Sequence, residues 1–579
     1  MVLRPRSLAE RSGRAVTRRS LTRWQRSLVA ALLVIASALD AALAAPTLFV
    51  GRIVTMDPAL PMAEAVLVDG ERIVAVGDAQ LRRIHEANAR VIDLGDRVML
   101  PGFIDAHGHL TATAAYINFV NLAPPPVGPV DDIGHLQQAL REHIERERIP
   151  AGQWIVGVGY DDSLLKEKRH PTGDDLDAIS TQHPIVIVHV SGHLSVGNSA
   201  LMSLLGISSA TVDPPGGVYR RRADSLEPNG VFEEMAHYAV LTRLPRPTAA
   251  EAMGGLRKTL QYMASMGLTT VQDGGANPEN VQLLRAAAER QMLDLDVVAY
   301  RYWSPIGNAL PTEFLSNEYQ NRFRLDGVKV ILDGSPQGKT AFLSQPYFVP
   351  PAGRDASYRG YPSLPEPAVK KAVAAALQAG VPLLAHANGD AAAELLINAV
   401  EAADVTERPR IVMIHSQTVR DDQLDRMAKL GMTPSFFVSH TFFWGDWHRD
   451  ETLGLERAAR ISPTRSATQR GIRYTLHNDP PVVPPDMIRT LWSATTRRTR
   501  SGQILGAEQR ASIEEALAGI TIDTARQYGE EARKGSITPG KQADFVILDQ
   551  DPLRMDPEDL LKLKVLETIS RGKTVYTAP

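Results

Sequence analysis

One pattern repeats along most of the chain: a short apolar run that ends in a polar residue, followed by a longer amphipathic stretch. Buried parallel strands have near-continuous apolar sequences, and the helices that connect them are amphipathic. Eight such runs occur, at residues 98–105, 268–273, 295–301, 327–333, 381–387, 410–416, 432–437 and 473–479. Eight strands with crossover helices predict an α/β fold, the closed (β/α)8 TIM-like barrel.

Two regions depart from this pattern. Residues 111–266 separate the first run from the second, are too long for one crossover, and contain strand-like segments of their own. Residues 47–100 and the segment after 535 are instead typical of short strands parted by turns. Strands from the two ends could be buried together in one small domain. We therefore expect a composite β-sandwich domain (45–100 plus 535–579), a barrel (101–534), and an α/β insertion (about 111–266) beside the barrel mouth.

Residues 1–44 have the composition of an export signal peptide. Eight Arg precede or flank an apolar run at 28–39, and Ala42-Leu43-Ala44 supplies a small-residue cleavage site. This run is shorter than the roughly 20 residues that a membrane-spanning helix needs. We expect a periplasmic or secreted protein with no stable membrane span after cleavage. Residues 17–21 resemble a twin-arginine signal, and the general secretory route is the alternative.

The rest of the chain is acidic and the whole chain lacks cysteine. Without the first 44 residues, which carry eight Arg, Glu10 and Asp40, the formal net charge changes from -3 to -9. An acidic chain without Lys/Arg clusters argues against nucleic acid as a partner and leaves a small-molecule substrate as the expected one. The absence of Cys excludes disulfides and thiolate ligands, so a metal site must use His, carboxylate or modified Lys.

Polar side chains that close the runs should gather where a barrel of this kind opens, at the C-terminal ends of its strands. His107 and His109 follow the first run and share one face of an extended segment, while His386, His415 and Asp479 close later runs. A lone His in such a place is more often structural. Four His and one Asp at the ends of four separate runs, the first two His sharing one run, instead predict one site for one or two divalent ions. Imidazoles with a carboxylate suit zinc or a similar ion.

Lys329 lies inside the apolar run 327–333, where a bare ammonium without a partner would cost several kcal/mol. Two arrangements avoid this cost. The side chain can extend to the mouth or pair with a carboxylate, or CO2 can carboxylate it and make it an anionic ligand that bridges two metals. Spacing alone favours the first arrangement.

Several motifs in combination resemble the amidohydrolase superfamily, specifically amidohydrolase family 3, the YtcJ-like branch that includes N-substituted formamide deformylases. The motifs, which begin with PGFIDAHGH, lie at 101–109, 191–201, 227–231, 327–334, 386–390, 479–484 and 535–545. The resemblance implies that six residues bind metal: His107, His109, Lys329 as a carboxylated bridge, His386, His415 and Asp479. It also implies that Asp479 is the general base. His477-Asn478 departs from the smaller residues expected before this Asp.

The expected activity is hydrolysis of a C–N bond in an amide, formamide or cyclic amide, by attack of metal-activated hydroxide with Asp479 as general base. Ester or lactone hydrolysis on the same site is the enzymatic alternative, and a non-catalytic metal- or solute-binding protein is the alternative of another class. His193 and Asp333 are further candidates for substrate contact, with a turn or cap role as the alternative for Asp333. Trp444 and Trp447 either line an apolar pocket or pack within their loop. The oligomeric state is open, a homodimer being one alternative.

Overall fold

The computed structural model describes residues 45–579 except 163, 191, 193, 215–216, 246, 312–314, 316–317, 352–353, 404 and 406. The predicted signal peptide, residues 1–44, lies outside the described residues. Among the described residues, no helix has the length and apolar character needed to cross a membrane.

Eight parallel strands form the central sheet, and their order in the sheet follows their order in the chain. They are β5 (Phe103–Ile104), β12 (Leu268–Ala276), β13 (Asp296–Tyr302), β14 (Phe323–Ile331), β15 (Leu383–Ala387), β16 (Ile411–His415), β17 (Thr433–Phe436) and β18 (Thr475–Leu476). The loops after β5 and β18 are joined by two backbone hydrogen bonds, Asp479 N to His107 O at 3.1 Å and His109 N to Pro480 O at 2.8 Å. These bonds close the sheet at its mouth and confirm the predicted (β/α)8 barrel.

Helices that follow the strands cover the barrel, and the apolar faces of most of them share one core with the strands. They are α3 (Leu110–Tyr116), α8 (Ala249–Ser265), α9 (Pro278–Glu289), α10 (Glu366–Gln378), α11 (Asp390–Glu401), α12 (Asp421–Leu430), α13 (His440–Trp447), α14 (Gly454–Ala459), α15 (Thr464–Gln469), α16 (Met487–Thr496), α17 (Ile513–Gly519) and α18 (Ile522–Gln527). Local sequence sets their starts: Asn277 caps α9 by accepting a hydrogen bond from Asn280 N, and Thr248 with Glu251 forms a capping box at α8.

Both ends of the described chain contribute to a seven-stranded sheet, in the order β21-β20-β19-β4-β1-β2-β3. Its strands are β1 (Thr47–Val54), β2 (Met62–Asp69), β3 (Arg72–Gly77), β4 (Arg90–Pro101), β19 (Phe545–Leu548), β20 (Val565–Ser570) and β21 (Lys573–Thr577), with the short helix α2 (Ala79–His85) after β3. The antiparallel pair β4–β19 joins the two halves. Residues 98–101, which the sequence pattern assigns to the first barrel strand, belong to this sheet, and only Phe103–Ile104 continue into the barrel.

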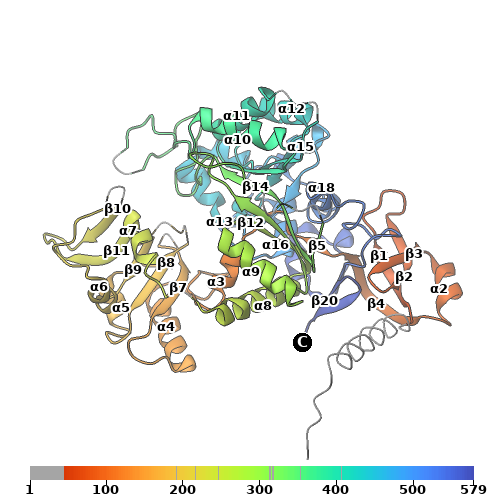
Figure 1. Cartoon of the computed structure of the whole chain (residues 1–579), viewed down its shortest axis with the longest axis horizontal. Helices are drawn as coiled ribbons and strands as arrows, with labels where there is room; N and C mark the ends of the chain where they lie inside the picture. Colours follow the sequence, from red (N-terminus) through yellow and green to blue (C-terminus); the bar gives the residue numbers. More distant parts are fainter. Residues whose placement is uncertain are drawn as a thin grey trace, which may run out of the picture.

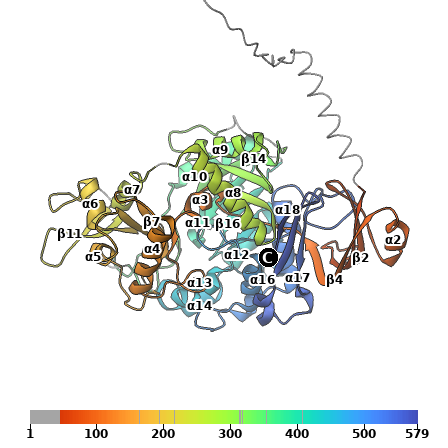
Figure 2. The same ribbon diagram turned by 90° about the horizontal axis from the view of Figure 1, so that it is seen from below.

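The segment between β5 and β12 contains a six-stranded sheet in the order β10-β11-β9-β8-β7-β6. Its strands are β6 (Val120–Asn121), β7 (Ile155–Tyr160), β8 (Ile185–His189), β9 (Leu194–Gly197), β10 (Gly217–Arg221) and β11 (Pro228–Glu234), accompanied by α4 (Ile133–Glu147), α5 (Gly173–Asp177), α6 (Ser199–Leu205) and α7 (Met235–Leu241). In two views at right angles this insert and the seven-stranded sheet lie on opposite sides of the barrel (Figures 1 and 2). Although most of α3 and all of α8 fall within 111–266, both helices contribute buried residues to the barrel core.

Candidate metal centre

The six predicted metal-binding residues all lie at the mouth of the barrel. Lys329, His386 and His415 are among the last residues of β14, β15 and β16, and the other three stand on the loops that follow β5 and β18. Because parallel strands of a barrel end at the same rim, side chains from distant parts of the sequence meet there.

The carboxylate of Asp479 lies among three of the imidazoles. Its Oδ1 atom is 3.1 Å from His109 Nε2 and 3.5 Å from His107 Nε2, and its Oδ2 atom is 3.8 Å from His415 Nε2. One ligand atom each from His107, His109 and Asp479 lie within 4.8 Å of one another. These separations allow one cation to contact all three side chains.

Lys329 and His386 extend this cluster. Lys329 Nζ is 2.9 Å from His107 Nε2, and the rings of His386 and His415 have centroids 4.5 Å apart. Lys329 is buried, with 2% of its surface exposed, and in the part of the chain that the structure describes it makes no ion pair with a carboxylate. Extension to the solvent and pairing with a carboxylate, the first of the two arrangements considered above, are therefore both absent from this geometry.

A second layer of side chains orients two of the imidazoles. Gln272 uses its Nε2 to donate to Ala106 O (2.9 Å) and to the Tyr528 hydroxyl (2.8 Å), which turns its Oε1 toward His107 Nδ1 at 2.6 Å. His107 thus carries its proton on Nδ1 and leaves the lone pair of Nε2 facing Asp479. His415 Nδ1 is likewise 3.2 Å from His477 Nε2, and His477 Nδ1 is 2.8 Å from Ser435 Oγ. Such partners fix the tautomer and the ring direction of metal-binding histidines.

The backbone turns sharply at two of these positions. His415 has φ of 74° and Asp479 has φ of 55°, in the left-handed region that residues other than Gly rarely adopt. Each such residue costs of order 1–3 kcal/mol and persists only where the surrounding structure enforces it. The turns direct both side chains inward from the ends of β16 and β18.

The protonation states of the buried residues suit a cation site, which requires neutral imidazoles and an ionised carboxylate. Burial lowers the pKa of His107 and His415 well below the usual value, so both rings are neutral. Burial alone would raise the pKa of Asp479, but His107 and His109 together hold it well below its usual range, so the group is a carboxylate. Burial also lowers the pKa of Lys329 to about 7.

Two buried polar atoms of the cluster lack a well-aligned hydrogen bond among the described residues: Asp479 Oδ1, despite its proximity to His109, and His386 Nδ1, which is 3.3 Å from Asp333 Oδ1. Buried polar atoms of this kind call for a partner. Neutral imidazoles and a carboxylate are ligands that zinc and similar divalent ions prefer. The residues present therefore fit a divalent metal ion.

The two candidate substrate contacts have different outcomes. His193 lies outside the described residues. Both carboxylate oxygens of Asp333 accept backbone hydrogen bonds. Its Oδ1 accepts from Asn388 N (3.0 Å), and its Oδ2 accepts from Gly389 N (2.8 Å) and Phe342 N (3.0 Å). Asp333 therefore holds the loop that follows His386, which is the turn-type alternative considered for it.

Sequence reasoning missed the orienting residues Gln272 and His477, as well as Asp105. Burial raises the pKa of Asp105 to about 7, and its Oδ1 accepts a hydrogen bond from His107 N at 3.2 Å. A signal existed for all three, since each is a polar residue at or near the end of a predicted apolar run. His477 in particular stood out as larger than expected before Asp479.

Comparison with known proteins agrees with this geometry. Residues 90–576 match the pattern of the Amidohydrolase family, and the chain belongs to that family, in its YtcJ-like branch. It is 27% identical over 541 residues to N-substituted formamide deformylase of Arthrobacter pascens, covering 90% of this chain and 96% of the relative. It is 25% identical over 551 residues to the putative amidohydrolase YtcJ of Bacillus subtilis (strain 168), covering 91% and 98%.

Among solved structures, an uncharacterized metal-dependent hydrolase from Pyrococcus horikoshii OT3 superposes with a TM-score of 0.69 at 23% identity, over 88% of this chain and 99% of that one. This likeness confirms the fold. Family membership makes the protein a metal-dependent hydrolase with a small-molecule substrate.

Proposed function

We propose that this protein hydrolyses the C–N bond of a small, non-peptide amide, formamide or cyclic amide, with Asp479 as the general base. The observation that carries the proposal is the position of the Asp479 carboxylate, 3.1–3.8 Å from the Nε2 atoms of three histidines at the barrel mouth. The similarity to an N-substituted formamide deformylase supports this bond type.

The proposed ligands of one or two divalent ions, with zinc as the expected metal, are the histidines of the cluster, Asp479 and a modified Lys329. Such an ion supplies Lewis acidity, which lowers the pKa of a water ligand to near 7 and polarises a carbonyl oxygen. The protein's part is to hold the ligands in fixed tautomers, through Gln272 and His477.

Carboxylation of Lys329 is part of the proposal. The neutral Nζ would attack CO2, forming an N–C bond and releasing one proton, so that a buried amine becomes an anionic carbamate. Its burial without a carboxylate partner among the described residues supports this step, because a fixed cation beside the imidazole of His107 would oppose metal binding.

Asp479 then moves the proton. Its Oδ1 has no well-aligned hydrogen bond and can accept a proton from the attacking water, then deliver that proton to the amine that leaves. The same oxygen atom accepts the proton from water and later donates it to the amine, as expected of a general base that then acts as a general acid.

The test combines metal analysis with a panel of amides and the matched esters. Purified wild-type protein should contain a divalent metal and hydrolyse at least one N-acyl or N-formyl amine. Asp479→Asn should lower kcat by roughly 10²–10⁴-fold, whereas Asn at the exposed Asp294 should leave it unchanged. Hydrolysis of esters alone would replace the amide assignment, and retained metal with no turnover of either class would contradict an enzymatic role.

A further inference from the structure

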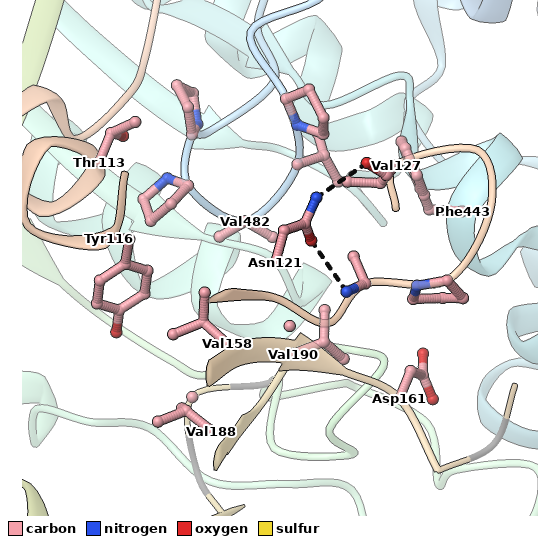
Figure 3. Close-up of a pocket in the computed structure, with 18 of the residues that line it drawn as sticks. Thr113, Tyr116, Asn121, Val127, Val158, Asp161, Val188, Val190, Phe443 and Val482 are labelled. Atoms are coloured by element: carbon pink, nitrogen blue, oxygen red, sulfur yellow. Dashed lines mark hydrogen bonds between the residues drawn. The ribbon is translucent and has the colours of Figure 1, made fainter. Parts of the chain in front are cut away.

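An apolar pocket of about 420 Å³ lies directly beside the candidate metal centre (Figure 3). Pro480, which follows Asp479 in the chain, lines it, as does Thr113 on the helix that begins directly after His109. Its volume falls within the roughly 300–1,000 Å³ of small-molecule sites. A molecule that reacts at the metal centre can therefore extend into this pocket.

The walls of the pocket come from two parts of the molecule. The barrel supplies Val482 and the aromatic residues Tyr262, Phe443 and Trp444, so of the two tryptophans considered above Trp444 lines the pocket. The insert supplies four valines, Val127, Val158, Val188 and Val190, from the ends of β7 and β8 and the loop after β6. Figure 3 shows Val158, Val188 and Val190 side by side on the insert wall.

The polar group nearest the middle of this wall is already satisfied. Asn121 Nδ2 donates to Val127 O at 3.1 Å, and Asn121 Oδ1 accepts from Ala123 N at 3.0 Å (dashed lines in Figure 3). Both ends of the Asn121 amide are thus held by its own loop.

Two side chains of opposite charge line the pocket. Arg500 and Asp161 both line it, and burial lowers the pKa of the Arg500 guanidinium while Asp161 acts to raise it. Arg500 also lies over the rings of Phe442 and Phe443, with its Cζ 5.6 and 5.2 Å from their centroids, and donates from Nη1 to Pro125 O at 2.6 Å. Asp161 and Arg500 thus carry opposite charges, and His189, which also lines the pocket, has its Nε2 3.0 Å from Asp162 Oδ1.

We propose that this pocket binds a bulky, uncharged, apolar substituent of the substrate, and that the insert selects substrates through its valine wall. The proposal rests on the amide hydrolysis proposed above and names the substrate class. An apolar group gains by leaving water for these side chains, whereas a charged group would lose its hydration on entering a pocket whose walls are mostly apolar.

A substrate series tests the proposal directly on the metal-loaded enzyme. N-formyl and N-acetyl amines with methyl, butyl and naphthylmethyl substituents should show kcat/KM rising by at least about tenfold from methyl to butyl, since methylenes in an apolar pocket have effects of this size. The 4-aminobutyl and 3-carboxypropyl amides, matched in length to butyl, should fall back by a similar factor. A flat series, or a preference for either charged amide, would overturn the proposal.

Variants on the insert wall show whether the insert is responsible. Val158→Trp fills the pocket and should lower kcat/KM for the naphthylmethyl amide at least tenfold more than for the methyl amide. Val190→Ala enlarges the pocket and should shift the preference toward the larger amide. Val218→Trp is the matched control, because Val218 lies on β10 at the far edge of the same sheet and is 41% exposed. Equal losses for small and bulky amides in Val158→Trp would contradict selection by the insert.

Binding separates this proposal from the proposed reaction. Calorimetry of the same amides with metal-loaded Asp479→Asn should give tighter binding of the naphthylmethyl than of the methyl amide, and Val158→Trp in that background should abolish the difference. If no amide is hydrolysed by the wild type but this preference is present, the reaction is wrong and the pocket assignment stands. If amides are hydrolysed without any size preference in rate or affinity, the pocket assignment alone fails.

Discussion

Two buried lysines, one at each end of the barrel, show how differently the same side chain is used. Lys534 lies at the floor, 1% exposed, with its Nζ 2.7 Å from Asp296 Oδ2 and 3.2 Å from Glu530 Oε2. Burial would lower its pKa, but these two carboxylates raise it above the ordinary value. Lys329 at the mouth is equally buried and has no such partner among the described residues, so burial lowers its pKa to about 7.

The surroundings of the two lysines extend this contrast. At the floor, where the strands begin, cations and anions alternate: Arg571 is 2.9 Å from Asp296, Arg410 is 2.9 Å from Asp326, and Arg324 is 3.3 Å from Glu530. At the mouth, imidazoles surround the carboxylate of Asp479. At the floor, cations pair with anions of the protein itself, whereas the mouth gathers electron-pair donors that fit a metal cation.

Replacing each lysine by Met should give the largest and most opposite effects. Lys534→Met leaves Asp296 and Glu530 buried with fewer partners and should lower the free energy of unfolding by about 3–5 kcal/mol. Lys329→Met removes an amine that makes no ion pair among the described residues and should leave the unfolding free energy of the metal-free protein unchanged or higher, while metal content and activity are lost. Urea denaturation in the presence of a chelator, together with metal analysis, measures both. Similar destabilisation by the two variants would remove the contrast between floor and mouth.

Asp544 gives the floor a pH dependence of known sign. Burial raises its pKa from 3.8 to about 6, so its contribution to stability is fully present below pH 3.8 and is lost as the pH rises through about 6. Asp544→Asn removes this loss, and the variant should gain roughly 2–3 kcal/mol relative to the wild type between pH 4 and pH 7.

Urea denaturation of both proteins across this pH range provides the measurement, with Asp294→Asn at an exposed position as the control. A difference between Asp544→Asn and the wild type that does not change with pH would show that the Asp544 carboxyl is not held in this state.

The smallest effect concerns the second layer at the mouth. His477→Phe keeps the volume of the side chain but removes the hydrogen bonds to His415 and Ser435, and should weaken zinc binding by about 10–100-fold. Competition with a fluorescent chelator measures the zinc Kd. His183→Phe, which removes a buried and hydrogen-bonded His from the insert, should leave the Kd unchanged. An unaltered Kd in His477→Phe would mean that His477 only fills space.

Much of the barrel could be predicted because its strands are buried on both faces, so each appears as an apolar run that ends where the chain reaches the mouth. The same rule located the cluster around Asp479 at the strand ends. The rule wrongly assigned residues 98–101 to the barrel, because an apolar run does not indicate which of two sheets contains the strand. It also could not find the role of His477, because the hydrogen bond to His415 joins residues 62 positions apart.

The pocket was beyond sequence reasoning for a related reason. Val158 and Val188 are ordinary strand residues in the pattern, and only the packing of the insert against the barrel places them opposite Phe443 and Val482. Which surface of an inserted domain meets the rest of the molecule depends on long-range contacts that no local periodicity encodes.

The charged floor also constrains the order in which the chain can mature during synthesis. Asp296, Arg324 and Asp326 belong to the third and fourth barrel strands, but Lys534 and Arg571 follow all eight strands in the sequence. A nascent chain that has emerged from the ribosome only as far as β18 would have to bury Asp296 without its main counter-ions. The barrel can therefore form these ion pairs only after the segment that carries β19 and β20 has emerged, so the final strengthening of its floor comes from the part of the chain that is made last.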